Sequence, residues 1–549
     1  MIKFFRKRAN YIVLLLIFLV AVFLRFYQLD QVPNGLHIDE AISGVNGNFL
    51  LHTGRDSNNG KWPLQTEVFG DYNPTGYAYL TIIPIKYWGL NEFSTRFPGA
   101  LLGSLTVFAS YFLAFSIFKS QKVGLLSAFL VAVSPWHIVF SRSSEQTLVA
   151  LFFVVLGFAL VFLNLGNKKP IFLILGVLSL GISLFMYFTP RVFVPLMFFT
   201  VLVLFFGPWY REKNTKHRNF LLCSLLFLVI IVAFLIFGIK GSDNRFNQVS
   251  IFGSLGTKLI MEEQIREDGI SGTSVKETRF FHNKLVNYSS SFISNYIEYY
   301  SSSFLFTTGG LPIWFRVEGM GLLYLVELPF IFMGFAILAV SKNKINKVPL
   351  LWLLIAPVTA AITIDDIPNI RRSFLMFPML EILSAFGFIN ILKNRKKLLK
   401  KFIILFVAIL FIYSFLYFFH LYFVHSPVHK NWYRNEGFGE MVSTVKKSYN
   451  DVDNVIVTKS AGGIYPLVLF YMNYDPKTYL KEGSSKDREY TGFGKFFFVP
   501  QACPSKEKDS RFPIGQNVYI DKGDCGQSSL RNKVILRKDG SRVFNVVYD

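Results

Sequence analysis

The first 424 residues alternate between long apolar runs and shorter polar stretches. The apolar runs are rich in Leu, Ile, Phe and Val and carry almost no charge, and a helix needs roughly 20 such residues to cross a bilayer. The pattern predicts about 11 membrane-spanning helices, near residues 11–29, 97–118, 123–140, 147–165, 171–188, 192–209, 220–238, 319–340, 348–364, 374–392 and 402–424.

Two long polar segments interrupt this alternation, residues 30–95 and 239–316. In the first, the apolar run 77–88 is too short to cross a bilayer, which favours a helix lying on the membrane surface. In the second, the aromatic and serine-rich run 281–306 fits two interpretations that stay open. It forms either an amphipathic helix on the membrane surface or a structured loop with no chemical role.

Beyond residue 424 the pattern changes to short runs separated by turn residues. It predicts a helix at 433–449, strands at 454–458, 495–499 and 518–520, and a hairpin at 533–547. The hairpin would turn at Asp539-Gly540, a pair that two-residue turns favour. We therefore expect two domains, a mainly α transmembrane bundle over 1–424 and a small α/β domain over 425–549.

Composition strengthens the membrane assignment. Hydrophobic residues make up 52% of the 549-residue chain, and Phe alone occurs 61 times. The mean hydropathy is +0.40. Soluble globular domains rarely carry so many long uncharged runs, so the sequence indicates a polytopic membrane protein.

The net charge of +22 would suggest a nucleic-acid partner if the chain were soluble. The basic residues concentrate in six short stretches between apolar runs, and these contain a single acid, Glu212: residues 3–8, 119–122, 168–169, 211–218, 342–347 and 393–401. Positive loops stay in the cytoplasm. The pattern therefore predicts a cytoplasmic N-terminus, an extracytoplasmic C-terminal domain and contact with the bilayer of the plasma membrane, and no nucleic-acid partner.

The last, polar region holds two cysteines, Cys503 and Cys525. A region outside the cytoplasm permits disulfides, so we expect these two to pair, with two free thiols as the alternative.

The predicted outer loops collect charged side chains that the bundle otherwise avoids. Arginine forks bind phosphate, and a neighbouring carboxylate can deprotonate an acceptor hydroxyl. Together these groups suit glycosyl transfer from a sugar carried on a lipid phosphate, whereas each arginine is equally consistent with a structural ion pair or a lipid-headgroup contact. The candidates are Asp39, Glu40, Glu145, Arg142, Arg191, Arg371 and Arg372.

Two further acids, Glu327 and Glu381, fall inside predicted spans. A carboxylate inside a bilayer is costly and often functional, although a protonated or hydrogen-bonded acid between helices is the interpretation we favour.

A recognisable series of short motifs extends from the end of the first predicted span, through the first loop, to the third span. They are Leu24-Arg25-Phe26, Leu36-His37-Ile38-Asp39-Glu40-Ala41, Leu50-Leu51-His52-Thr53-Gly54-Arg55-Asp56, Asp71-Tyr72-Asn73-Pro74, Arg96-Phe97-Pro98-Gly99 and Ser134-Pro135-Trp136-His137. This series resembles GT-C glycosyltransferases, the superfamily of protein O-mannosyltransferases and lipid A aminoarabinose transferases. The resemblance is good over residues 11–150, looser through the later spans and weak after residue 424.

The resemblance implies a general base at Asp39, with Glu40 as its partner, and a second acidic site nearest to Glu145. The outer loop around Glu145 holds no clear Asp-x-Asp motif, which favours the branches thought to act without a metal. The favoured hypothesis therefore requires no cofactor and leaves Mg²⁺ or Mn²⁺ as an alternative. The arginines are candidates for binding the donor phosphate, by location.

We therefore expect an inverting membrane glycosyltransferase that moves a sugar from a polyprenyl-phosphate donor to a protein, lipid or glycan. The alternative is a transporter or flippase for lipid-linked sugars. Transporters usually hold charged groups near the bilayer midplane, whereas this chain concentrates them in its first outer loop, which favours the enzyme.

Overall fold

The computed structural model describes residues 2–549 except 168–169, 212–223, 233, 235–247, 430, 463, 483–491 and 526–530. It separates into two compact units. The helical unit comprises Met1–Leu24, Leu102–Phe140 and Gln146–Phe418. The mixed unit comprises Arg25–Leu101, Ser141–Glu145 and Phe419–Asp549.

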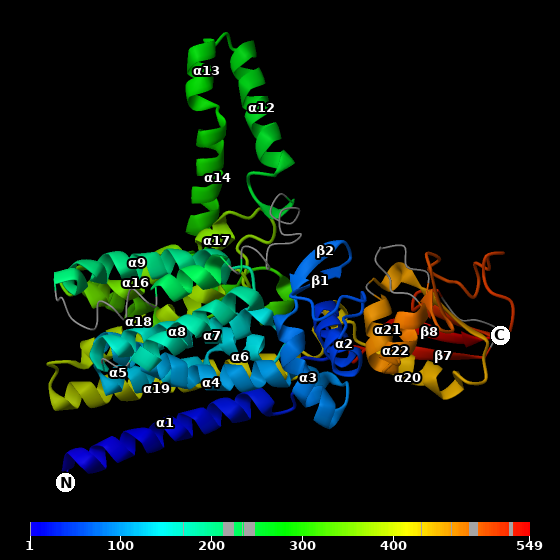
Figure 1. The fold of residues 1–549 in the computed structure, drawn as a ribbon, viewed down its shortest axis with the longest axis horizontal. Coiled ribbons are helices and arrows are strands. Elements are labelled where there is room, and N and C mark those ends of the chain that lie inside the picture. Colours follow the sequence, from blue (N-terminus) through cyan, green and yellow to red (C-terminus); the bar gives the residue numbers. More distant parts are fainter. Residues whose placement is uncertain are drawn as a thin grey trace. The chain divides into compact units, whose positions relative to one another are not determined.

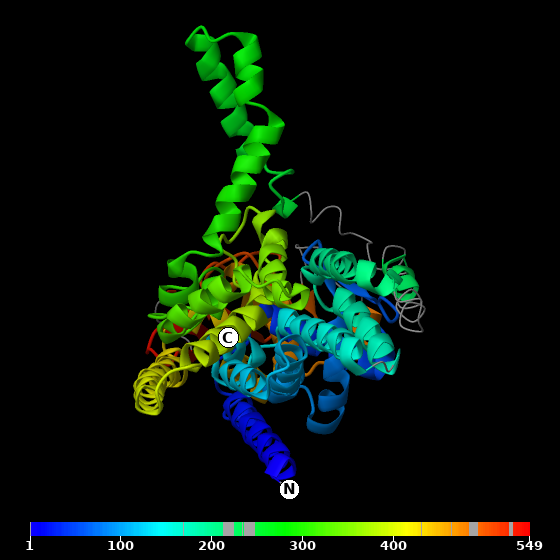
Figure 2. The same cartoon turned by 90° about the vertical axis from the view of Figure 1, so that its left-hand side faces the viewer.

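The helical unit contains many apolar helices, the longer of which run alongside one another (Figures 1 and 2). They are α1 (Ile2–Phe26), α4 (Glu92–Phe118), α5 (Gln121–Val133), α6 (Pro135–Ser141), α7 (Gln146–Asn167), α8 (Pro170–Met186), α9 (Pro190–Arg211), α15 (Leu328–Ala339), α16 (Val348–Ile355), α17 (Val358–Ala361), α18 (Phe377–Leu392) and α19 (Lys397–His420). The multi-pass helical architecture predicted from the sequence is confirmed.

By length and apolarity, six helices among the described residues can cross a membrane, or seven if the bent pair α5 and α6 counts as one span. This pair corresponds to the predicted span 123–140. The axes of its two helices are bent by 57°, and Pro135 begins the second helix. Three further helical stretches, Pro170–Met186, Pro190–Leu204 and Leu325–Ala339, are apolar but have only 10–17 residues. The predicted span 220–238 lies partly outside the described residues.

Small residues let neighbouring spans approach closely, as in other membrane bundles. A Cβ on Gly157 of α7 would lie 3.0 Å from the carbonyl oxygen of Gly176 on α8. A Cβ on Gly387 of α18 would overlap the carbonyl oxygen of Phe330 on α15. Larger side chains at these positions would force the helices apart.

A helical hairpin occupies most of the described part of the segment 239–316, formed by α12 (Leu255–Ile270), α13 (Val275–Phe281) and α14 (Lys284–Glu298). The hairpin extends crosswise to the membrane-spanning helices (Figures 1 and 2). The sequence run 281–306 is thus helical over much of its length, and short π and 3-10 turns follow at Ser303–Thr307, Ile313–Phe315 and Leu325–Glu327.

The mixed unit combines the first loop with the C-terminal segment. Its helices are α2 (Ile38–Thr53), α3 (Gly76–Trp88), α20 (Phe438–Ser448), α21 (Ile464–Met472) and α22 (Pro476–Glu482). Its strands are β1 (Gln65–Val68), β2 (Asp71–Pro74), β3 (Asn454–Thr458), β4 (Gly492–Phe493), β5 (Phe496–Val499), β6 (Asn517–Lys522), β7 (Asn532–Leu536) and β8 (Arg542–Tyr548).

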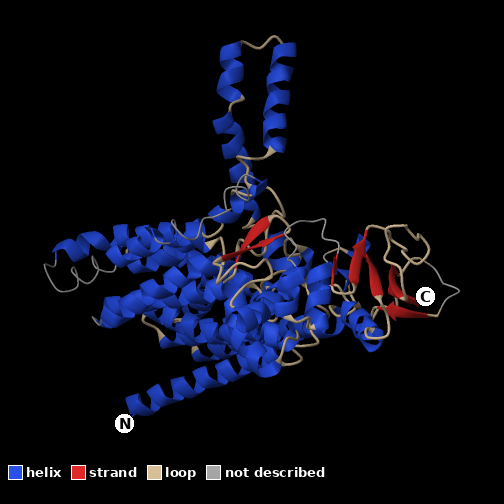
Figure 3. Cartoon of the chain, turned by 45° about the vertical axis from the view of Figure 1, so that its right-hand side comes forward, coloured by secondary structure: helices blue, strands red, loops and turns tan. Residues whose placement is uncertain are grey.

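Strands β1 and β2 form a small hairpin, and the other six form one sheet in the order β4-β5-β3-β6-β8-β7 (Figure 3). Strand β3 pairs in parallel with β5 and β6, whereas the remaining pairs are antiparallel. The C-terminal sheet predicted from the sequence is confirmed.

One hydrophobic core joins the two halves of the mixed unit. Leu36, Val45 and Phe49 from the first loop and α2 are buried with Phe470 of α21 and Val457 of β3. The first loop therefore packs with the C-terminal segment, and the division at residue 424 remains a prediction.

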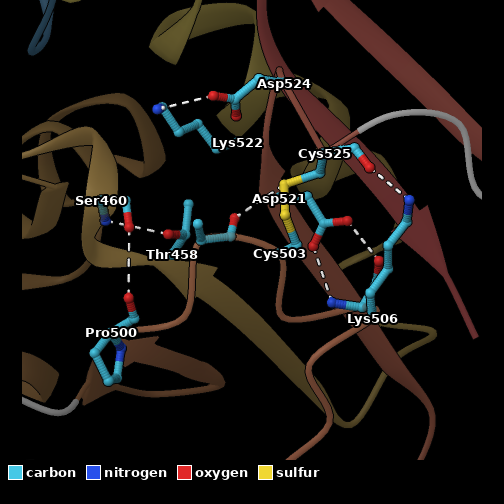
Figure 4. The surroundings of a disulfide bond; sticks show 11 residues. Thr458, Ser460, Pro500, Cys503, Lys506, Asp521, Lys522, Asp524 and Cys525 are labelled. Carbon is cyan, nitrogen blue, oxygen red and sulfur yellow. Dashed lines mark hydrogen bonds and ion pairs between the residues drawn. A yellow bond between two sulfur atoms is a disulfide. The ribbon is translucent and has the colours of Figure 1, made fainter.

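A disulfide joins Cys503 and Cys525 beside β6 (Figure 4). Next to it, Asp521 accepts hydrogen bonds from the backbone N–H and the hydroxyl of Ser505, while Lys506 donates to the Cys525 carbonyl. These contacts hold the loop that precedes β6 against the strand.

Candidate functional site

Asp39 and Glu40 lie in the first turn of α2. Acidic side chains are favoured at a helix N-terminus because the helix dipole is positive there. His37 is the N-cap, and its Nδ1 accepts a hydrogen bond of 3.3 Å from the Asp39 N–H. That Nδ1 lies 3.7 Å from Asp39 Oδ2. The side chain of Asp39 is 40% exposed, so solvent and ligands can reach this carboxylate.

Glu40 has the opposite environment, being 3% exposed. Arg96 in the first turns of α4 donates to Glu40 Oε2 from Nε at 3.2 Å and from Nη2 at 3.0 Å. Arg434 donates to Glu40 Oε1 at 3.1 Å. Consecutive helical residues point about 100° apart, so one carboxylate of this adjacent pair faces outward and the other is buried. We call Glu40, Arg96 and Arg434 the buried ion triad.

Arg96 also ties the start of the first loop to the triad. Its guanidinium donates to the carbonyls of Leu29 and Pro33, each at 3.0 Å, and to that of Gly35. Arg96 is completely buried. These hydrogen bonds stabilise the conformation of the loop that leads into α2.

Arg434 and its neighbour clamp the same loop from the C-terminal segment. Arg434 Nη2 donates to the Ser143 hydroxyl at 3.3 Å, and Asn435 donates to the Leu36 carbonyl at 2.8 Å. A Cβ on Gly35, whose φ is +71°, would lie 2.3 Å from the Arg434 carbonyl oxygen. Gly35 is therefore needed both for its backbone conformation and for this close approach.

Two other predicted site residues, Arg142 and Glu145, also belong to the mixed unit and are buried. Arg142 Nη2 donates to the carbonyls of Gln28 at 3.0 Å and Val32 at 2.7 Å. Its guanidinium carbon lies 4.9 Å from the centre of the Phe423 ring. Burial lowers the pKa of the Arg142 guanidinium. Arg142 therefore supports the loop that precedes α2.

The remaining predicted arginines lie in the helical unit. Arg372 forms a bidentate pair with Asp365, with both N–O distances at 2.8 Å, and also donates to Thr363. The Arg191 guanidinium lies 4.5 Å from the centre of the Phe188 ring, and that of Arg371 lies 5.4 Å from the centre of the Phe315 ring. Since these residues belong to the other unit, their grouping with Asp39 stays a prediction.

Among the described residues, no group of three or more His, Cys, Asp or Glu side chains could hold a metal ion. The hypothesis of a reaction without a metal, and its alternative with Mg²⁺ or Mn²⁺, both stay predictions. The two acids predicted inside spans, Glu327 and Glu381, are both buried, and Glu327 accepts a hydrogen bond of 3.4 Å from the Tyr324 N–H.

The sequence did not single out His37, Ser143 or Arg434 as site residues. Arg96 was visible in the motif series, and a lone arginine in the first turns of an apolar span is a signal that could have been used. Arg434 had no such signal because it lies 394 positions after its partner Glu40.

Residues 73–237 match the model of a family described as dolichyl-phosphate-mannose-protein mannosyltransferase. A comparison with curated proteins gives no match. Among solved structures, the chain is similar to ArnT from Cupriavidus metallidurans, in the apo state and bound to undecaprenyl phosphate. The identities are 11% and 10% and the TM-scores 0.53 and 0.54; the alignments cover 98% and 97% of both chains.

The chain is also similar to the archaeal oligosaccharyltransferase AglB from Archaeoglobus fulgidus, in complex with an inhibitory peptide and a dolichol-phosphate. Here the identity is 14% and the TM-score 0.51, over 85% of this chain and 64% of that one. At these identities the likeness describes the fold, and that fold agrees with the resemblance carried by the first-loop motifs.

Proposed function

We propose that this chain is a membrane glycosyltransferase of GT-C type that transfers a sugar from a polyprenyl-phosphate carrier. The proposed acceptor is a hydroxyl of a protein, lipid or glycan on the extracytoplasmic face of the plasma membrane. Two solved structures with this fold support the donor class, since one is bound to undecaprenyl phosphate and the other to dolichol-phosphate.

The observation that carries the proposal is the contrast between two adjacent acids. Asp39 is accessible at the N-terminus of α2, whereas Glu40 is fixed by two arginines. A general base must reach the proton that it removes, and it is most effective when its position is fixed. Asp39 meets the first condition, and the buried ion triad beneath it meets the second.

In the proposed reaction, the acceptor oxygen attacks the anomeric carbon while the bond from that carbon to the carrier phosphate breaks. The hydroxyl proton passes to Asp39, and the electron pair of the broken bond leaves with the phosphate. Attack opposite to the leaving group inverts the anomeric configuration. Glu40 acts as a positioning residue, because both of its oxygens already accept hydrogen bonds from guanidinium groups.

Arg191 and Arg371 are the proposed contacts for the carrier phosphate. Their guanidinium carbons lie 4.5 Å and 5.4 Å from the centres of the Phe188 and Phe315 rings, and Arg191 Nε also donates to the Leu184 carbonyl at 3.2 Å. Arg372 forms a bidentate pair with Asp365, and Arg142 donates to two backbone carbonyls of the segment that precedes α2. These two are proposed to support the fold.

The test is sugar transfer by purified Asp39→Asn protein from a polyprenyl-phosphate donor. A general base contributes about 10²–10⁴-fold, so the rate should fall by at least that lower figure. Asp30→Asn is the matched control, since Asp30 is an exposed acid of the same loop. Full activity of Asp39→Asn would reject the base assignment. Movement of lipid-linked sugar across liposomes without any transfer by the unmodified chain would reject the enzyme in favour of a transporter.

A further inference from the structure

The helical hairpin of α12, α13 and α14 is attached to a membrane-spanning helix at a point where that helix is broken. Pro357 separates α16 from α17 within the candidate span Lys344–Ala361. Proline has no N–H, so the carbonyl of Leu353, four residues earlier, has no intrahelical donor. In a bilayer such a carbonyl must find another partner.

Two tyrosines at the end of α14 supply hydrogen bonds at this break. The Tyr300 hydroxyl donates to the Leu353 carbonyl and the Tyr296 hydroxyl donates to the Leu354 carbonyl, each at 2.7 Å. The neighbouring Asn295 of α14 donates to the carbonyls of Ala361, the last residue of α17, and of Thr363, two residues beyond it. The base of α14 is therefore bonded to the candidate span Lys344–Ala361, on a surface where the apolar Leu354 side chain is 55% exposed.

From this base α14 extends crosswise to the spans (Figures 1 and 2), and so along the plane of a membrane. One face of α14 is apolar and exposed. Leu285 is 77% exposed, Ile293 54% and Ile297 61%, and Val286 joins them at 44%. The opposite face carries polar side chains, among them Lys284 and Glu298.

Pairing within the hairpin does not cover this apolar face. Neither α12 nor α14 contains a buried residue. The apolar face is continuous with the lipid-facing surface of α16, through the contacts of Tyr296 and Tyr300. An amphipathic helix with its polar face toward water and tyrosines at its base suits the boundary between lipid chains and headgroups.

We propose that α14 lies in the interface of the bilayer, with Leu285, Val286, Ile293 and Ile297 against lipid. The hairpin is then a lateral arm that rests on the membrane beside the helical bundle. Its partner is the lipid surface itself, and this contact is independent of the sugar-transfer proposal.

The test measures the depth of single positions in the full chain, reconstituted in liposomes of phosphatidylethanolamine and phosphatidylglycerol. The chain has one cysteine besides the disulfide pair, Cys223, and Cys223→Ser removes it. In this background spin labels are attached to Leu285→Cys or Ile293→Cys, and to Lys284→Cys as the control on the opposite face. Labels on the apolar face should collide more with oxygen and less with a water-soluble nickel chelate than the label at position 284. Equal nickel accessibility at the three positions would overturn the proposal. So would dipolar broadening between labels, which would assign the face to a second copy of the chain.

A second variant separates lipid contact from local folding. Tyr296→Phe with Tyr300→Phe removes the two hydroxyls at the helix break and keeps the aromatic rings. Nickel accessibility at the Ile293 position should then increase, while the label at Lys284 should change little. An unchanged ratio of oxygen to nickel accessibility at position 293 would reject the role of the tyrosines in setting the arm at membrane level.

Discussion

The buried ion triad gives the sharpest quantitative prediction. Glu40→Gln keeps the shape of the side chain but removes the negative charge between Arg96 and Arg434. At 3.0 Å for Arg96 and 3.1 Å for Arg434, and an effective dielectric constant of about 20, each pair attracts by about 5.5 kcal/mol before desolvation is counted. Breaking a buried pair by removing one partner typically costs about 3–5 kcal/mol, because a charge stays buried without its counterion. We expect a loss of stability of that size.

Arg434→Gln should cost less, about 1.5–3 kcal/mol, because Glu40 keeps both hydrogen bonds from Arg96. The double variant tests whether the two residues act together. If they form one triad, the double variant loses less stability than the two single losses added, by more than about 0.5 kcal/mol. Unfolding in mixed micelles with a rising fraction of dodecyl sulfate gives the four free energies of the cycle.

The same variants separate positioning from folding. If the triad fixes Asp39, Glu40→Gln should lower kcat for sugar transfer and leave KM for the donor nearly unchanged in protein that is still folded. Two results would refute the reasoning: additive losses of stability in the cycle, or a Glu40→Gln protein with unaltered stability and kcat. A higher KM alone would assign Glu40 to substrate binding instead.

Three further predictions test the mixed unit, each by the free energy of unfolding. Gly35→Ala should destabilise by more than Gly70→Ala, because both glycines have positive φ but a Cβ at Gly70 meets no atom within 4 Å; equal losses would argue against the clash. Removing the Cys503–Cys525 disulfide should cost about 3 kcal/mol, since it closes a loop of 22 residues; an unchanged midpoint would contradict this. Burial raises the pKa of Asp56 above its ordinary 3.8, so the folded chain binds that proton more tightly. The contribution of Asp56 to the free energy of unfolding should therefore increase as pH falls through the raised pKa. Asp56→Asn should remove this increase from the plot of unfolding free energy against pH.

Local patterns predicted the elements well where burial alone decides the structure. The strand predicted at 454–458 is β3, five consecutive buried residues whose apolar run fits a central strand. The predicted run 123–140 is instead two helices, and Pro135 inside it was the available signal for the break. Apolarity identifies a span, whereas its straightness depends on single residues.

The site was less predictable because adjacent residues can have opposite environments. Nothing local distinguishes Asp39 from Glu40, since both are acids in the first turn of one helix. Their difference comes from Arg96 and Arg434, which reach Glu40 from distant parts of the chain. Similarly, location suggested a phosphate contact for Arg142, but carbonyls of the first loop bind its guanidinium.

The contact between Glu40 and Arg434 also has a consequence for biosynthesis, because 394 positions separate them in the chain. A ribosome that adds about 5–20 residues per second takes about 20–80 s to cover that distance. During this interval the nascent first loop has Arg96 but lacks its second cation and the clamp on its backbone. The loop thus leaves the ribosome long before it can take its final form. A chain truncated before Arg434 lacks one cation of the buried ion triad, and we expect it to be inactive, so synthesis delays activity at least until Arg434 has been added.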